Sequence, residues 1–161
     1  MRILTVRQPW AEAIIFGRKD VENRVRNVAG SYRGPVAIHT AKREATPAEW
    51  RDFEANHPDA LSRMAETVPW AQDEYGVIIG VVDLVDVHRG HNAEDDRFRA
   101  VRSCYRAGKP FGPCSTWALP DNWHIELENP RALDEPIPFK GALGLRHLDA
   151  DTIALIESRL T

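Results

Sequence analysis

Six runs of apolar residues along the chain predict β-strands, because each is rich in β-branched residues or alternates between apolar and polar side chains. They lie at residues 3–6, 21–25, 36–40, 75–87, 123–128 and 142–145. The run at 75–87 is the longest apolar segment, so we expect it to form the central strand. The last run follows a proline-rich bend at 136–138. The pattern therefore predicts five or six strands of mixed length.

Helix signals lie at four places around these strands, and they predict helices over residues 10–16, 47–56, a short stretch after 58, and about 150–160. Pro9 stands where a helix tolerates proline, just before the first of them. Thr46 and Glu49 form a capping box, with Pro47 at the first helical position. Asp149 is a favourable N-cap for the last helix. Together the elements predict an α+β fold, a small mixed β-barrel with flanking helices, rather than a doubly wound sheet.

Composition is that of an ordinary folded domain. The chain has 161 residues, of which 43% are hydrophobic and 28% are charged. No apolar run approaches the roughly 18 residues of a membrane span, and the N-terminus lacks the pattern of a secretory signal. The two cysteines, Cys104 and Cys114, are too few for a disulfide framework. We expect a single cytoplasmic domain with no membrane partner and with both cysteines as thiols.

Charge is distributed unevenly, although the net charge is only −3. Residues 1–43 hold nine basic and three acidic side chains, a net charge of +6, so the rest of the chain carries −9. A second basic cluster at 97–114 contains no acid and interleaves arginines and a lysine with three aromatic residues. Cations interleaved with aromatic rings are typical of surfaces that bind phosphates and stack bases. The plainer alternative is that either cluster only solvates a surface.

The sharpest motif runs from residue 17 to 24 and has the form G-x-K-x-x-E-x-R. Gly17 would let the backbone leave the preceding helix and approach a ligand closely. Lys19 and Arg24 offer a point charge and a bidentate fork for phosphates or base edges. Glu22 can accept from an exocyclic amine or act as an ion-pair strut for the two cations. The motif predicts a site for nucleic acid or a nucleotide.

Other candidates lie near this motif. Trp10 is either a platform for a base or a core anchor. His39 lies within a predicted strand, where a structural histidine is the alternative to a ligand contact, and Lys42 at the end of that strand is better placed for phosphate. The candidate nucleic-acid-binding residues are therefore Gln8, Trp10, Gly17, Lys19, Glu22, Arg24, His39, Lys42, Arg102, Arg106 and Lys109.

The helix after Gln8, the motif at 17–24, the segment at 33–42 and the closing segment at 138–145 together resemble the ASCH domains of the PUA-like superfamily. The resemblance spans nearly the whole chain and implies one domain over residues 1–161. It leaves a helical insertion at about 46–72 and a basic loop at about 89–115 as the least constrained parts. It implies a PUA-like β-barrel with a basic cleft, and RNA, single-stranded nucleic acid or a modified nucleoside as the partner.

The resemblance also leaves an enzymatic function open as an alternative. One branch of the superfamily hydrolyses N4-acetylcytidine, with a lysine matching Lys19 and a threonine nucleophile where this chain has Glu22. That mechanism would need Glu22 to act as a general base on water instead. Metal-independent RNA cleavage is a further possibility, for which Tyr32, His39, Lys42 and Ser115 are candidates. If the protein is an enzyme, the candidate catalytic residues are Lys19, Glu22, Tyr32, Lys42 and Ser115. A third hypothesis is a module whose cleft receives an acidic peptide.

Histidines and cysteines near the second basic cluster suggest a metal site. His88 and His91 are three residues apart, and Cys104 and Cys114 follow. However, the nine-residue gap between the cysteines fits no common zinc finger or ribbon. From spacing alone we therefore predict no metal and no cofactor.

Overall fold

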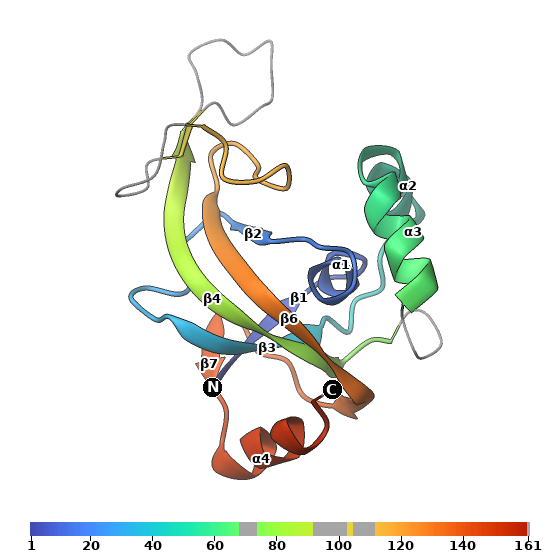
Figure 1. The fold of residues 1–161 in the computed structure, drawn as a ribbon, viewed down its shortest axis with the longest axis vertical. Coiled ribbons are helices and arrows are strands. Elements are labelled where there is room, and N and C mark those ends of the chain that lie inside the picture. The colour runs from blue at the N-terminus through green and yellow to red at the C-terminus, as the bar shows by residue number, and fades with distance from the viewer. Residues whose placement is uncertain (68–73, 92–102, 105–111, 161) are drawn as a thin grey trace.

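The computed structural model describes residues 1–67, 74–91, 103–104 and 112–160 (Figure 1). These residues form strands β1 (Arg2–Val6), β2 (Val21–Arg24), β3 (Gly34–Thr40), β4 (Val77–His91), β5 (Ser103–Cys104), β6 (Trp123–Pro138) and β7 (Leu145–His147). They also form helices α1 (Trp10–Ile15), α2 (Pro47–Asn56), α3 (Pro58–Thr67) and α4 (Ala150–Ser158). No helix in these ranges has the length and apolar character needed to cross a bilayer. The predicted α+β class is confirmed.

One mixed sheet organises the fold. Its strands lie in the order β2-β6-β4-β3-β1-β7, and the short strand β5 pairs with β4 beside this path. The two long strands β4 and β6 run antiparallel and curve together across the molecule (Figure 1), whereas β1 and β3 are parallel. The sheet differs from the predicted small mixed β-barrel in one respect, which is that it does not close. Within the described residues the edge strands β2 and β7 pair only with β6 and β1, so the sheet stays open.

The strand β6 is much longer than the predicted run at 123–128, although prolines occur within it. Arg131 pairs with Val81 and Glu128 pairs with Asp83, so two residues of β6 stand opposite one residue of β4. This β-bulge contains Asn129, whose φ of 51° lies in the left-handed region, and the proline that follows it. A bulge leaves an extra residue outside the ladder, and therefore the proline does not end the strand.

The strand β7 begins at Leu145, whereas the apolar run predicted a strand at 142–145. Gly144 has a φ of +74°, a left-handed conformation that suits a turn and not a strand. A Cβ atom at Gly141 would lie 2.4 Å from Cε1 of His39, so this part of the chain also passes close to a buried ring. The chain therefore turns first and pairs with β1 only afterwards.

Both faces of the sheet are covered by helices. On one face Leu4 and Ile38 pack with the α1 residue Ile14, and on the other face Ile3 packs with the α4 residue Ile156. This alternation follows from the period of two along a strand. The two faces thus each bury an apolar layer, with α1 and α4 on opposite sides of the sheet (Figure 1).

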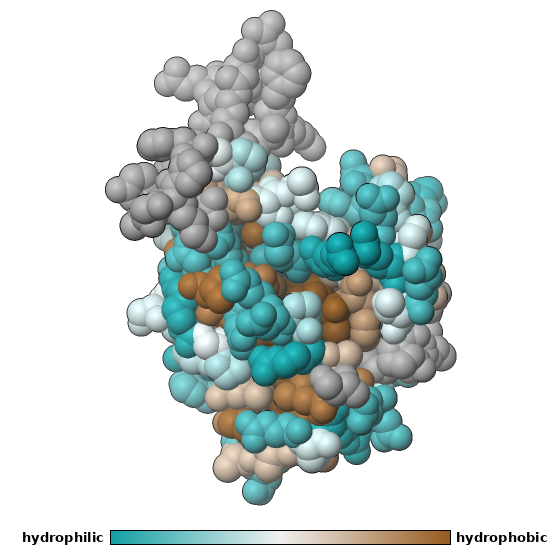
Figure 2. All heavy atoms as spheres, in the orientation of Figure 1, coloured by the Kyte–Doolittle hydropathy of each residue, from teal (hydrophilic) through white to brown (hydrophobic). Residues whose placement is uncertain are grey.

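Helices α2 and α3 pack against α1 instead of the sheet. The predicted capping box is present, because Thr46 accepts from the backbone of Glu49 and the Glu49 carboxylate accepts from the backbone of Thr46. Phe53, Ala60 and Met64 are buried against α1, and hydrophilic side chains predominate over these helices in Figure 2. This helical pair therefore buries one narrow stripe and stands beside α1 as one wall of the pocket described next.

Candidate functional site

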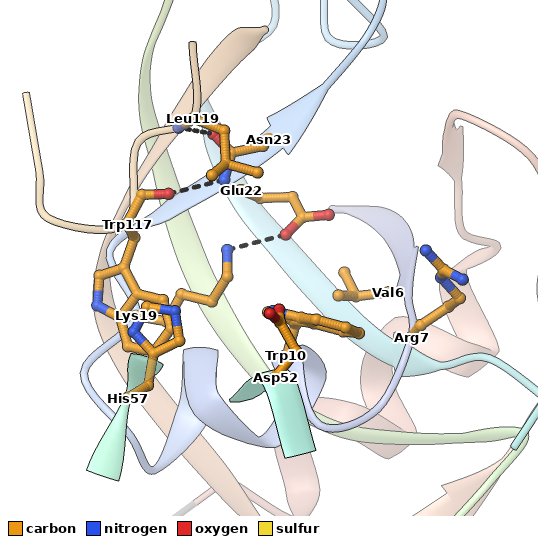
Figure 3. A pocket seen from close by; sticks show the side chains of 10 residues that line it. All are labelled: Val6, Arg7, Trp10, Lys19, Glu22, Asn23, Asp52, His57, Trp117 and Leu119. Carbon is orange, nitrogen blue, oxygen red and sulfur yellow. Dashed lines mark hydrogen bonds and ion pairs between the residues drawn. The ribbon is translucent and has the colours of Figure 1, made fainter. Parts of the chain in front are cut away.

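A pocket of about 260 Å³ lies where helix α1, strand β2, the α2–α3 pair and the segment before β6 meet (Figure 3). Its lining comes from three separate stretches of the chain and consists of Val6, Arg7, Trp10, Lys19, Glu22, Asn23, Asp52, His57, Trp117 and Leu119. The lining carries two cations, Arg7 and Lys19, and two anions, Glu22 and Asp52, so its formal charges balance. The pocket is therefore a polar, aromatic-walled cavity, and the basic cleft expected from the sequence stays a prediction.

A buried ion pair lies at the centre of the pocket. The Lys19 ammonium is 3.0 Å from Oε2 of Glu22, and the two residues are only 3% and 8% exposed. Lys19 also donates to the backbone carbonyl of Val21. The other carboxylate oxygen of Glu22 lies 3.1 Å from Arg24, which donates in turn to the carbonyl of Thr5 at 2.7 Å. Glu22 thus bridges two cations, one deep in the pocket and one beside it.

Local backbone geometry explains why Lys19 points inward. Arg18 follows α1 with a φ of 60°, a left-handed conformation, and the Lys19 amide donates to the carbonyl of Ala13 at 2.9 Å. This turn satisfies a carbonyl at the end of α1 and reverses the chain before β2 begins. The side chains of Lys19 and Glu22 are then three residues apart on a segment that lies over the pocket.

Aromatic rings form the pocket walls. The His57 ring stacks on Trp117 with a centroid separation of 3.8 Å and an interplanar angle of 19°. Phe53 lies behind both this stack and Trp10, with centroids 6.1 Å from Trp117 and 6.3 Å from Trp10. Figure 3 shows the ion pair of Lys19 with its carboxylate partner between the Trp117 side of the pocket and the Trp10 side. The walls therefore offer π-faces next to a charged donor and a charged acceptor.

The side chain of Asn23 holds the Trp117 wall in place. Its Nδ2 donates to the carbonyl of Trp117 at 2.8 Å, and its Oδ1 accepts from the amide of Leu119 at 2.8 Å. Ser115 donates to the carboxylate of Asp20 and accepts from the Trp117 amide. Strand β2 and the turn before it thus fix the conformation of a segment almost one hundred residues away in the sequence.

His57 is the titratable ring of the pocket. Burial, followed by the nearby Lys19 charge, lowers the pKa of His57 below its ordinary value. The imidazole is therefore neutral at neutral pH, with one nitrogen able to donate and the other able to accept.

Three of the residues singled out from the sequence line this pocket, and a fourth reaches it through an ion pair. Trp10, Lys19 and Glu22 line the pocket, and Arg24 touches it through its ion pair with Glu22. The residues that do not line it are Gln8, Gly17, Tyr32, His39, Lys42 and Ser115. Arg102, Arg106 and Lys109 lie outside the described residues.

Two of the residues outside the pocket have clear structural roles. Gln8 is buried and donates to the Glu12 carboxylate at 2.7 Å within the first turn of α1. His39 is 1% exposed and its Nε2 lies 3.1 Å from the carbonyl of Phe139. Both side chains are therefore held inside the fold, and a role for them in binding stays a prediction.

Gly17 also lies where the chain packs closely. A Cβ atom there would lie 2.9 Å from the Ala13 Cα and 3.2 Å from the Ala60 Cβ. The close approaches at Gly17 are therefore to the end of α1 and to α3, and the role of Gly17 at a ligand stays a prediction.

Tyr32, Lys42 and Ser115 are not gathered as a catalytic set. The Tyr32 hydroxyl donates to the carbonyl of Pro35 at 2.8 Å, and Ser115 donates to Asp20. Lys42 is exposed, and its side chain lies against Gly76. None of the three lines the pocket that holds Lys19.

Sequence reasoning missed Asn23, His57 and Trp117. Asn23 stands inside the motif at 17–24 and could have been noticed as a polar residue on the same strand as Glu22. His57 and Trp117 carry no local signal, because only the tertiary packing of α2 and of the segment before β6 brings them to the pocket.

An open mixed sheet covered by helices on both faces, with a polar pocket at one side, is an α+β architecture consistent with the PUA-like fold. The model of the ASCH domain family matches residues 4–136, and the chain belongs to this family. The matched range contains the whole pocket lining, strands β2 to β5 and all of β1 except its first two residues. The family is associated with binding of nucleic acid, and of RNA in particular.

Proposed function

We propose that this ASCH domain binds RNA or a modified nucleoside by holding one base in the pocket at Lys19 and Glu22. The observation that carries the proposal is the buried ion pair between aromatic walls. A pocket whose charges balance suits a neutral, polar, flat group better than it suits a phosphate. The family association with RNA supports the same class of ligand.

The chemistry of a nucleobase complements this lining. A base face can stack on Trp10 or Trp117, and such stacking contributes about 1–3 kcal/mol per base. The Lys19 ammonium can donate to a ring nitrogen or carbonyl, while the Glu22 carboxylate can accept from an exocyclic amine. An adjacent donor and acceptor match the polar edge of a base that carries both groups. The pocket volume of about 260 Å³ is slightly below the usual range for ligand sites, which favours one base over several.

Phosphates would lie at the rim and not inside. Arg7 lines the pocket with a side chain that is half exposed, and it lies over the Trp10 ring at 5.9 Å. Arg7 also pairs with Glu49 at 2.6 Å, so a phosphate would compete with that carboxylate. Rim contacts of this kind add salt-dependent affinity without selecting a base.

Trp117→Ala gives the most direct test. Binding of short single-stranded RNAs and of a panel of standard and modified nucleosides would be measured by titration, with circular dichroism to verify the fold. We expect Trp117→Ala to weaken binding roughly 5- to 150-fold, the equivalent of one lost stacking contact. Lys140→Ala removes an exposed lysine outside the lining and is the control, with unchanged base preference. Unchanged affinity in a natively folded Trp117→Ala protein would remove the pocket from the binding site.

A hydrolytic reaction is the second candidate, and His57 is the observation that favours it. A neutral imidazole beside a lysine supplies a base and a cation in one pocket, which RNA cleavage or deacylation of a base would require. Mass spectrometry of the same incubations separates the two functions. Products that form with the unmodified protein and disappear with His57→Gln would identify an enzyme, whereas saturable binding without products supports a binding protein.

A further inference from the structure

Four potential metal ligands converge where strand β4 ends and strand β6 begins, beside the short strand β5. His88 lies on β4, Cys104 on β5 and His124 on β6, and Cys114 lies in the segment that follows β5. One ligand atom from each of the four lies within 4.8 Å of the others. Three of the residues are buried and Cys114 is half-buried. Two thiols and two imidazoles in this arrangement form a possible closed coordination shell.

Strand register brings three of these side chains together. His88 and His124 are direct partners in the β4–β6 ladder, and Cys104 is the partner of Gly90 in the β4–β5 ladder. A Cβ atom at Gly90 would lie 2.3 Å from Cε1 of His124, so the imidazole packs directly on a backbone without a side chain. The cluster is thus built into the sheet and does not depend on a chance meeting of surface side chains.

The hydrogen bonds of His124 determine which nitrogen can bind a metal. Its Nε2 lies 2.7 Å from the carbonyl of Leu119, and a carbonyl can only accept, so Nε2 carries the proton. The lone pair is then on Nδ1, which lies 3.4 Å from the Cys104 sulfur and 3.3 Å from the Cys114 sulfur. The single lone pair on Nδ1 can accept a good hydrogen bond from only one thiol, whereas both cysteine sulfurs lie close to it. A backbone carbonyl on the far nitrogen is also the usual outer contact of a metal-binding histidine.

His88 shows the same arrangement. Its Nδ1 lies 3.1 Å from a carboxylate oxygen of Asp86, which places the proton on Nδ1 and the lone pair on Nε2. That Nε2 atom is buried and has no hydrogen-bond partner among the described residues. The rings of His88 and His124 are perpendicular, with centroids 5.3 Å apart. A buried nitrogen that lacks a partner is costly, and a metal ion would satisfy it.

We propose that His88, Cys104, Cys114 and His124 bind one zinc ion through Nε2, two thiolate sulfurs and Nδ1. Zn–S bonds of about 2.3 Å and Zn–N bonds of about 2.0–2.1 Å place sulfur and nitrogen about 3.5 Å apart in a tetrahedron. The two observed sulfur–nitrogen distances of 3.3 and 3.4 Å are close to this edge. Two thiolates with two imidazoles in a tetrahedron favour zinc over the hard cations magnesium and calcium.

The site has a structural and not a catalytic character, because four protein ligands leave no open position. It would tie the segment before β6 to the ends of β4 and β5. The spacing argument failed to find it because the ligands come from separate strands, and because His124 completes the set in place of the expected His91. The side chain of His91 lies outside what the structure describes.

Cobalt substitution of the 161-residue protein tests the proposal. Zinc content would be measured on protein purified without chelators, and Co²⁺ would then be added to the metal-free form. We expect one zinc per chain, an intense tetrahedral cobalt spectrum and a thiolate-to-cobalt charge-transfer band. Weak octahedral absorption without that band would overturn the proposal, and it would instead favour the carboxylate set of Asp86, His88 and Glu126. Cysteines that resist alkylation until they are reduced would also overturn it, in favour of a disulfide.

Variants assign the ligands. We expect Cys114→Ser to weaken zinc affinity more than tenfold and to reduce the charge-transfer band. Asp86→Ala, which removes the outer contact of His88, should weaken zinc affinity about 10- to 100-fold with the band retained. His147→Gln changes an exposed histidine outside the cluster and should leave zinc affinity unchanged. Zinc affinity that is the same in Cys114→Ser would refute the assignment. If a variant fails to fold, the cobalt spectrum of the unmodified protein still decides.

Discussion

Glu22→Gln should destabilise the protein more than Lys19→Met does, although both substitutions break the same ion pair. The reason is that Glu22 pairs with two cations, Lys19 and Arg24, whereas Lys19 pairs with Glu22. After Glu22→Gln the Lys19 ammonium, whose side chain is 2% exposed, keeps only neutral oxygen acceptors, such as the Val21 carbonyl, among the residues that the structure describes. After Lys19→Met the carboxylate keeps Arg24 at 3.1 Å. The first change therefore leaves a buried charge without a counter-charge, and the second does not.

General magnitudes turn this asymmetry into numbers. Removing one partner of a buried ion pair typically costs about 3–5 kcal/mol, and we expect about 3 kcal/mol for Glu22→Gln because the amide oxygen can still accept from Lys19. Lys19→Met loses a charged hydrogen bond, so we expect about 1.5 kcal/mol. For a chain of this size these values correspond to a fall in Tm of roughly 6–12 °C and roughly 3–6 °C. The double variant should cost less than the sum, with a coupling of about 1 kcal/mol or more.

Urea unfolding followed by circular dichroism measures these free energies, at two salt concentrations to separate buried from exposed charge effects. Glu135→Gln is the control, because Glu135 is 78% exposed and its pair with Arg159 is 3.6 Å long. It should leave stability essentially unchanged. If Lys19→Met costs as much as Glu22→Gln or more, the bridging role of the Glu22 carboxylate is refuted.

Two further predictions concern the pocket walls. Stability should fall as the pH drops from about 7.5 to about 5.5, because the folded pKa of His57 is below 6.5 and the unfolded chain therefore binds the proton more readily. In thermal melts the pH dependence of Tm should be smaller for His57→Gln than for the unmodified protein, and it should be unchanged in the exposed control His147→Gln. The same pH dependence in all three proteins would contradict a lowered pKa of His57 in the folded state. Phe53→Ala should cost about 3–5 kcal/mol in urea unfolding, because the fully buried ring supports Trp10 and Trp117, whereas Phe53→Leu should cost less. Equal stability of Phe53→Ala and the unmodified protein would show that helix α2 contributes no packing energy to the pocket walls.

Local signals in the sequence predicted local structure well. The capping box at Thr46 and Glu49 depends on residues three apart, so the pattern and its physical cause lie in the same short segment. Lys19 and Glu22 are likewise three residues apart, and their pairing follows from a turn directly after α1. The family match over residues 4–136 confirms the resemblance that these segments suggested.

Features that depend on strand pairing could not be predicted from the sequence. Whether a sheet closes depends on how its edge strands pair. The run at 21–25 predicted β2 to within one residue, but no apolar run predicted the bounds of β7 or the partner of either edge strand. The bulge at Asn129 depends on the ladder between β4 and β6, which also places His88 opposite His124. A spacing template assumes ligands on one hairpin or loop, and it fails where register in a sheet brings distant residues together.

The segment from Cys114 to His124 connects the proposed zinc site with the pocket. Both of its ends are proposed ligands, and between them it contributes Trp117 to the pocket wall. On the pocket side the segment is held by Asn23, which uses both its amide nitrogen and its amide oxygen for this purpose. A wall fixed at both ends and in the middle loses little conformational entropy when a base stacks on it, since the ordering has already occurred on folding. A zinc ion at the far side would therefore act on the pocket through the position of Trp117, without contacting the bound base.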